Sequence, residues 1–274
     1  MTSHSQLSFD DPVDVGIVVA LEREIGLFLY NHPEHRRQEG NQAVFLQTSL
    51  NNTHIGIAIT GPGQDRATMG TRALCDAMHP RWIISVGYGG ALLPQLKVAD
   101  AVFIEEVVTS SDEHMKLGGR YPFSKGEVPC RVNLNGQSLR VLQGSLYSTD
   151  RIISSITERT EIAKKHGAAV VDMETSAVIQ VARDRHIPVL AMRAISDDLQ
   201  TELPSEIARL LEKEGASRWG ALSAALWKKP KLVKLLWKLK QDTLLASETL
   251  AGALEYLISN LPTGEKSANS NEVD

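Results

Sequence analysis

Apolar positions along this chain fall into short continuous runs that are separated by segments with helical spacing. Residues 13–20 and 82–86 are almost entirely apolar and rich in Val and Ile, which is typical of strands buried on both faces. Residues 21–30 and 65–78 have a helical pattern instead. Because strands and helices alternate, the pattern predicts an α/β three-layer αβα sandwich around a central mixed β-sheet, with a helical C-terminal extension.

The same pattern continues along the next part of the chain. Residues 43–48 and 54–60 predict two strands joined by an Asn-rich turn. Residues 110–130 are polar and contain several Gly and Pro, which indicates a loop near the mouth of a site. The other predicted elements are strands at 101–108, 138–147 and 188–195, a helix that ends at His166 and is capped by Gly167, and helices at 174–185 and 205–214.

Composition divides the chain into four parts. Residues 1–12 and 263–274 are polar, and we expect them to be disordered. Residues 13–215 carry the alternating pattern of one catalytic domain, and residues 216–262 form the extension, which is helical in pattern and broken at Pro230. This extension holds Trp219, Trp227 and Trp237 and a cluster of six lysines at positions 228, 229, 231, 234, 238 and 240.

The bulk composition excludes several classes of protein. The chain has 274 residues, is 42% hydrophobic and carries a net charge of −4, so nothing calls for a nucleic-acid partner. Its two cysteines, Cys75 and Cys130, do not form a disulfide framework, and a cytoplasmic location fits best. We see neither a signal peptide nor an apolar run of roughly 20 residues. The histidines lack metal-binding spacing, so we expect no metal and no organic cofactor.

Candidate chemistry lies where predicted strands end. Glu24, Glu174 and Asp197 each follow an apolar run, and the glycine-containing segments 61–63 and 87–90 follow two others. Ligands of open α/β sheets bind beyond the carboxyl ends of the strands, and half-buried carboxylates usually have a partner or a task. The pattern therefore predicts a site that grips a polyol and protonates a leaving group. The glycine segments are interpreted as turns that permit close backbone approach, with phosphate cradles as the alternative.

Four motifs, in this order and spacing, resemble those of the nucleoside phosphorylase/nucleosidase superfamily. They are residues 20–24, 85–92, 172–174 and 193–197, and the likeness covers roughly residues 13–215. Within that superfamily the chain is similar to the hydrolase branch typified by 5′-methylthioadenosine/S-adenosylhomocysteine nucleosidase.

The resemblance implies hydrolysis of the N-glycosidic bond of a purine nucleoside, a 5′-modified adenosine, with release of adenine. In that scheme Asp197 is the general acid at purine N7. Glu174 binds a ribose hydroxyl and opposes the positive charge that develops on the sugar, and Glu24 orients and deprotonates the attacking water. The implied substrate-binding residues are Met173, Ile152, Ile153, Ser196, Gly87, Tyr88 and Gly63.

Two other functions stay open at this point. The phosphorylase branch places an arginine soon after its first strand and a serine in the glycine-rich segment, whereas this chain has Glu24 and Tyr88. A carboxylate repels phosphate, so these residues favour hydrolysis and leave a phosphate-dependent phosphorylase as the alternative. A non-catalytic nucleoside-binding protein of the same fold is the third possibility, and absence of turnover would favour it.

The extension bears on the 5′ substituent of the nucleoside. Residues 226–232 resemble the tail of hopanoid-pathway nucleosidases, which implies an adenosylhopane-type substrate beside the methylthioadenosine and S-adenosylhomocysteine types. Lysine-rich helices with tryptophan can contact a membrane surface, here through residues 226–240. The pattern is more typical of apolar residues docked on or beside the core with the lysines in solvent, so membrane contact and a subunit interface are the alternatives to that docking. The resemblance also implies a homodimer.

Overall fold

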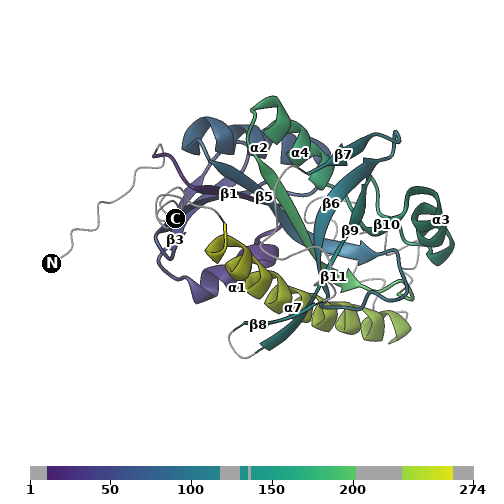
Figure 1. Cartoon of the computed structure of the whole chain (residues 1–274). Helices are drawn as coiled ribbons and strands as arrows, with labels where there is room; N and C mark the ends of the chain where they lie inside the picture. Colours follow the sequence, from purple (N-terminus) through teal and green to yellow (C-terminus); the bar gives the residue numbers. More distant parts are fainter. Residues whose placement is uncertain (1–10, 118–129, 135–136, 202–229, 262–274) are drawn as a thin grey trace, which may run out of the picture.

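A central mixed sheet organises the chain (Figure 1). The computed structural model describes residues 11–117, 130–134, 137–201 and 230–261. Its strands are β1 Val15–Val19, β2 Arg36–Glu39, β3 Val44–Leu50, β4 Thr53–Ile59, β5 Trp82–Ala91, β6 Ala101–Thr109, β7 His114–Lys116, β8 Cys130–Leu134, β9 Gln137–Ser148, β10 Ala168–Asp172 and β11 Val189–Asp197. These strands form one sheet in the order β10-β9-β6-β11-β5-β1-β4-β3-β2, with β7 paired to β6 and β8 paired to β9.

The sheet is parallel at its centre, where β1 pairs with β4 and β5, and β5 pairs with β11. Strand β6 then runs antiparallel to β11, so the sheet is mixed as predicted. Because β1, β5 and β11 are parallel, their carboxyl ends meet at one edge of the sheet. Ligands of such sheets bind beyond this edge.

Helices cover both faces of the sheet (Figure 1). An apolar core forms on each face, because successive side chains of a strand point to opposite faces. Val15, Ile17 and Val19 of β1 pack with α1 and α7, whereas Val18 packs with α2 and α4. This arrangement confirms the predicted αβα sandwich. The helices are α1 Glu22–Asn31, α2 Gln64–Met78, α3 Ile156–His166, α4 Thr175–Asp184 and α7 Pro230–Ser259.

The glycine-rich segment 87–90 differs from the prediction. We interpreted it as a turn that follows a strand ending at residue 86 and permits close backbone approach. The turn is wrong because β5 continues through the segment to Ala91, whereas the close approach is present at Gly89. In this stretch β5 pairs with β11 and also with β10. At Gly89 the neighbouring strand lies too close to leave room for a side chain. A Cβ added to Gly89 would lie 2.4 Å from the Val170 side chain.

Three strands carry no clear apolar signal in the sequence. Strand β2 is exposed at all four residues, and β7 falls inside the segment that we predicted to be a loop. Strand β8 lies next to that segment. The rest of the predicted loop, residues 118–129, lies outside the described residues. So do residues 1–10, the predicted helix 205–214, the stretch 219–229 and the predicted disordered tail 263–274.

Helix α7 packs against the body of the fold. It begins at Pro230, where the helical pattern was predicted to break. Leu250, Leu254 and Leu257 of α7 are fully buried in the same core as β1. At the surface, Asn31 donates a 3.0 Å hydrogen bond to the Glu255 carboxylate of α7. The division of the chain at residue 215 stays a prediction.

Candidate active site

A cavity of about 490 Å³ opens at the carboxyl edge of the sheet. Its walls come from the carboxyl ends of β1, β5, β10 and β11 and from the start of α1, so segments far apart in the sequence meet there. Glu24, Glu174 and Asp197 all contribute to its lining, as the strand-end rule predicted. The other lining residues are Ala20, Leu21, Glu22, Arg23, Pro62, Tyr88, Gly89, Gly90, Arg151, Ile152, Ile153, Arg159, Val171, Asp172, Met173 and Ser196.

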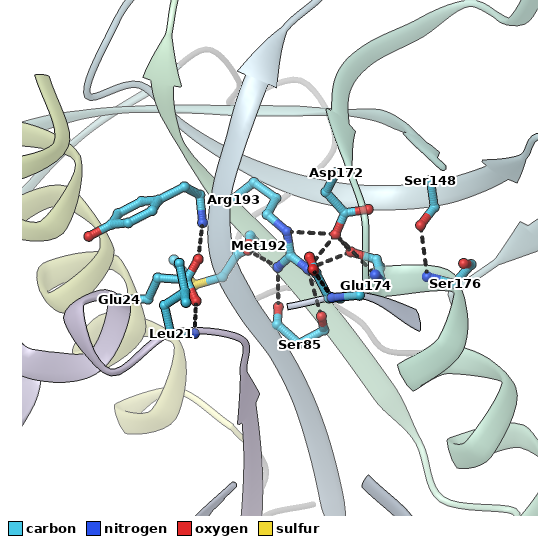
Figure 2. Close-up of polar contacts among 12 residues, drawn as sticks. Leu21, Glu24, Ser85, Ser148, Asp172, Glu174, Ser176, Met192 and Arg193 are labelled. Atoms are coloured by element: carbon cyan, nitrogen blue, oxygen red, sulfur yellow. Dashed lines mark hydrogen bonds and ion pairs between the residues drawn. The ribbon is translucent and has the colours of Figure 1, made fainter. Parts of the chain in front are cut away.

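Glu24 lies in the first turn of α1 and is only 7% exposed. Its carboxylate accepts a hydrogen bond of 2.7 Å from the backbone N–H of Leu21 and one of 3.2 Å from that of Tyr88 (Figure 2). Burial raises the pKa of Glu24, and these two hydrogen bonds and the charge of Arg193 oppose the rise. By contrast, Glu22 is exposed and pairs with Arg37 at 2.7 Å. A buried carboxyl with a raised pKa is suited to take up a proton.

Glu174 lies two residues after the end of β10 and occupies the N-cap position of α4. Its Oε1 accepts a 2.8 Å hydrogen bond from the backbone N–H of Gly63. Burial, and then the negative charge of Asp172, raises the pKa of Glu174 from 4.5 to about 7. Two carboxyl groups with raised pKa values, Glu24 and Glu174, therefore line the same cavity.

Asp197 is the last residue of β11 and has two different partners. Its Oδ1 accepts a 2.8 Å hydrogen bond from the Ser196 hydroxyl. Its Oδ2 lies 2.5 Å from Nη2 of Arg159, in an ion pair whose side chains are 17% and 4% exposed. Oδ2 makes no hydrogen bond within the described part of the chain, so the contact with Arg159 is electrostatic. Arg159 was not among the residues predicted for the site, because it lies in a mostly polar helix where an arginine carries no special signal.

A buried charge network fixes the strand ends that carry these carboxyl groups. Arg193 of β11 donates from Nε and Nη2 to Oδ2 of Asp172 at 3.1 and 2.8 Å. The same guanidinium donates to the carbonyl oxygen of Ser85 at 3.0 Å and to its hydroxyl at 2.8 Å. Figure 2 shows this network, which ties β5, β10 and β11 together. Arg193 and Asp172 stood in the predicted motifs, but the sequence analysis gave them no role.

A second, small cavity of about 10 Å³ lies between Glu24, Glu174 and Arg193. This volume is about that of one probe sphere, the least that can hold a water molecule, and a buried water needs two to four polar partners. The walls offer carboxylate, guanidinium and hydroxyl groups, so the recess suits one water. Its other lining residues are Val18, Val19, Ala20, Thr60, Ser85, Val86, Gly87, Tyr88 and Val178.

The remaining predicted site residues take different positions. Met173, Ile152, Ile153, Ser196 and Tyr88 line the large cavity, and Gly87 lines only the small one. Gly63 contacts Glu174 through its backbone and is not in either lining.

Tyr88 connects the cavity wall to two helices. Its hydroxyl donates to the carbonyl oxygen of Arg23 at 3.1 Å and lies 2.7 Å from the Ser247 hydroxyl of α7. Helix α7 therefore reaches a residue of the cavity wall. Among the described residues, no helix is long and apolar enough to cross a membrane, and no group of three or more His, Cys, Asp or Glu is arranged to hold a metal ion.

Comparisons with known proteins point in one direction. The model of the Phosphorylase superfamily matches residues 14–228. A 5′-methylthioadenosine/S-adenosylhomocysteine nucleosidase of Staphylococcus haemolyticus is 24% identical over 199 residues, which are 67% of this chain and 86% of that protein. The corresponding protein of Maridesulfovibrio salexigens is 25% identical over 217 residues, 74% of this chain and 94% of its own length.

Solved structures share the fold. The 5′-methylthioadenosine/S-adenosylhomocysteine nucleosidase of Helicobacter pylori superposes with a TM-score of 0.66 at 17% identity, covering 93% of this chain and 100% of that one. The futalosine hydrolase of Helicobacter pylori superposes with a TM-score of 0.66 at 18% identity, covering 90% of this chain and 97% of that one.

Proposed function

This chain belongs to the phosphorylase superfamily, and we propose that it hydrolyses the N-glycosidic bond of a purine nucleoside. The observation that carries the proposal is the meeting of Glu24, Glu174 and Asp197 in one cavity, with a water-sized recess beside Glu24. Cleavage of such a bond needs a group that protonates the base, one that opposes positive charge on the sugar and one that activates water. The three carboxyl groups supply these functions.

Asp197 acts at the purine. It gives or shares its proton with N7 as the bond between C1′ and N9 breaks, so that the base leaves as a neutral molecule. Ile152, Ile153 and Ser196 line the same cavity as Asp197, and we assign them to contact with the base. General acid catalysis of this kind contributes about 10²–10⁴-fold to the rate.

Glu174 acts at the sugar. Its carboxylate accepts hydrogen bonds from a ribose hydroxyl and stabilises the positive charge on the ring, while Met173 packs against the sugar. Hydrogen bonds to a charged group are about twice as strong as neutral ones. The backbone N–H of Gly63 holds one oxygen of Glu174 in place, which leaves the other for the substrate.

Glu24 acts on water. A water molecule in the small recess would lie between Glu24 and the guanidinium of Arg193. Glu24 accepts a proton from this water as the oxygen attacks C1′ on the face opposite to the base. Acid and base on the two sides of the bond, with a water between, is the arrangement of inverting glycosidases.

The size of the recess supports hydrolysis over phosphorolysis. A volume of about 10 Å³ accepts one water but not a phosphate ion, and phosphate in this position would meet the carboxylate of Glu24. Release of the base should therefore proceed at the same rate with and without inorganic phosphate. A requirement for phosphate would establish the phosphorylase alternative.

We propose 5′-modified adenosines as the substrate class. The curated relatives are named for 5′-methylthioadenosine and S-adenosylhomocysteine, and a cavity of about 490 Å³ falls in the size range of small-molecule sites. The test is a panel of adenosines and inosines with methylthio, homocysteinyl and hopanyl groups at the 5′ position, assayed for free base. No turnover across the panel would favour a nucleoside-binding protein instead.

We also propose a homodimer, which the resemblance to the nucleosidases implies. For lipid-linked substrates we propose contact with a membrane surface through residues 226–240. Sedimentation equilibrium tests the dimer, and co-sedimentation with vesicles containing anionic lipid tests the membrane contact. Retention in the supernatant at low ionic strength would exclude the membrane contact. A monomer at micromolar concentration would exclude the dimer.

A further inference from the structure

Helix α3 contacts the site through an arginine. Arg159 is 3% exposed and is the one residue of α3 that is buried. Removing a guanidinium from water is costly, and a buried ion pair is often no more stable than apolar side chains of the same volume. A role in chemistry explains why this position holds a cation.

The guanidinium of Arg159 joins three points at the base end of the cavity. Its Nε donates to the carbonyl oxygen of Ile153 at 2.9 Å, and its Nη1 donates to that of Asp198 at 3.3 Å. Its Nη2 lies 2.5 Å from Oδ2 of Asp197. Two anchors on the backbone therefore fix the cation against the side chain that we assign as the general acid.

We propose that Arg159 is a positioning residue that acts on the leaving base through Asp197. The inference rests on the proposed function. Asp197 takes up a proton from solvent when the nucleoside binds. During cleavage this proton moves to N7, and the electron pair of the bond between C1′ and N9 passes to the purine. The water oxygen bonds to C1′ and its proton passes to Glu24. Asp197 is left as a carboxylate, and the fixed cation at 2.5 Å stabilises this negative charge as it develops.

A nucleoside that needs no proton separates this role from a structural one. A purine nucleoside methylated at N7 carries a positive charge on the base, so its base leaves as a neutral molecule without proton transfer from Asp197. Arg159→Met removes the charge and keeps a long side chain. We expect this variant to lose about 10–100-fold in kcat on the ordinary adenosine, part of the gain from general acid catalysis, and less than about 3-fold on the N7-methylated one.

The control variants are a conservative substitution and a distant arginine. Arg159→Lys keeps the charge and should recover part of the loss on the ordinary substrate. Arg140 pairs with Asp100 at 2.7 Å outside the cavity lining. Arg140→Met should therefore change kcat by the same factor on both substrates. If Arg159→Met does not fold, Arg159→Gln replaces it. Its loss of kcat on the ordinary nucleoside is then compared with its loss on the N7-methylated one, with Arg159→Lys as the reference.

The outcomes distinguish the two levels of the argument. An equal loss on both substrates, or no loss on either, overturns the role of Arg159. Asp197→Asn tests the proposed function separately: if it retains normal turnover of the ordinary nucleoside, the general acid assignment itself fails. If Asp197→Asn is inactive while Arg159→Met behaves as the wild type, only the inference about Arg159 is wrong.

Discussion

The backbone N–H of Gly63 donates a 2.8 Å hydrogen bond to the carboxylate of Glu174. The two residues are 111 positions apart in the sequence. Gly63 lies in the loop after β4, and Glu174 lies just after β10. Gly63 has a φ of +98°, a backbone conformation that side chains other than hydrogen rarely permit. The glycine thus places an N–H group where a carboxyl group must be held.

Gly63→Ala should therefore impair the site through the backbone and without a steric clash. A Cβ at this position meets nothing within 4 Å, so the effect comes from the backbone, at a cost of roughly 1–3 kcal/mol. We expect kcat to fall about 10-fold because Glu174 loses its anchor. Steady-state kinetics and chemical unfolding measure both effects. Gly26→Ala in α1 also meets nothing within 4 Å and should leave turnover unchanged; equal behaviour of the two variants would disprove the anchor.

Glu174→Gln should be more stable than the wild type at alkaline pH. The pKa of Glu174 is raised from 4.5 to about 7 by burial and by Asp172, so the folded protein binds this proton more tightly than the unfolded chain. Stability therefore falls as pH rises from about 4.5 through about 7. Glutamine has no such dependence and should gain about 1–3 kcal/mol at pH 8.

Thermal unfolding at pH 8 and at pH 4.5 checks this difference. The gain in Tm should be present at pH 8 and absent at pH 4.5, and the variant should be nearly inactive at both. A Tm below that of the wild type at pH 8 would mean that the Glu174 carboxylate stabilises the fold.

The rise of kcat/KM with pH should follow the ionisation of Glu24. A general base works only when ionised, and burial raises the pKa of this carboxyl above the ordinary value of 4.5. Activity should rise with pH along a limb that lies above 4.5. Glu24→Gln should lose about 10²–10⁴-fold in kcat together with the limb. Glu39→Gln, at an exposed residue paired with Arg37 at 3.0 Å, should keep both.

Helix α7 should contribute to folding rather than serve as a detachable addition. Leu254 is fully buried, whereas Leu244 of the same helix is 58% exposed. Leu254→Ala should lower the free energy of unfolding by about 2–5 kcal/mol. Leu244→Ala should change it by no more than about 0.5 kcal/mol. Urea unfolding of the two variants gives the comparison. Equal, small losses would show that α7 can leave the core without unfolding it.

The sequence predicted those parts of the site that follow from a simple rule. Glu24, Glu174 and Asp197 lie at or within a few residues of the ends of apolar runs, and the edge of a parallel sheet brings such positions together. Which of Glu22 and Glu24 faces the cavity interior was a matter of helix rotation, and burial of Glu24 decides it.

Other parts of the site could not be predicted, because they depend on contacts between residues that are remote in the sequence. Arg159 stands in a helix whose other described residues are not buried, and its partner Asp197 is remote in the sequence. Segment 87–90 looked like a turn because glycine allows turns, yet here it allows β5 to lie against Val170 of β10. Both are packing relationships between distant segments, which composition and spacing do not contain.

The most direct test of the account is the Asp197→Asn variant, assayed for adenine release from a 5′-modified adenosine and, by calorimetry, for binding of the same nucleoside. Asparagine retains the size of the side chain and cannot act as the acid at N7. We expect at least about a 100-fold loss of turnover with binding largely retained. Turnover near that of the wild type would contradict it.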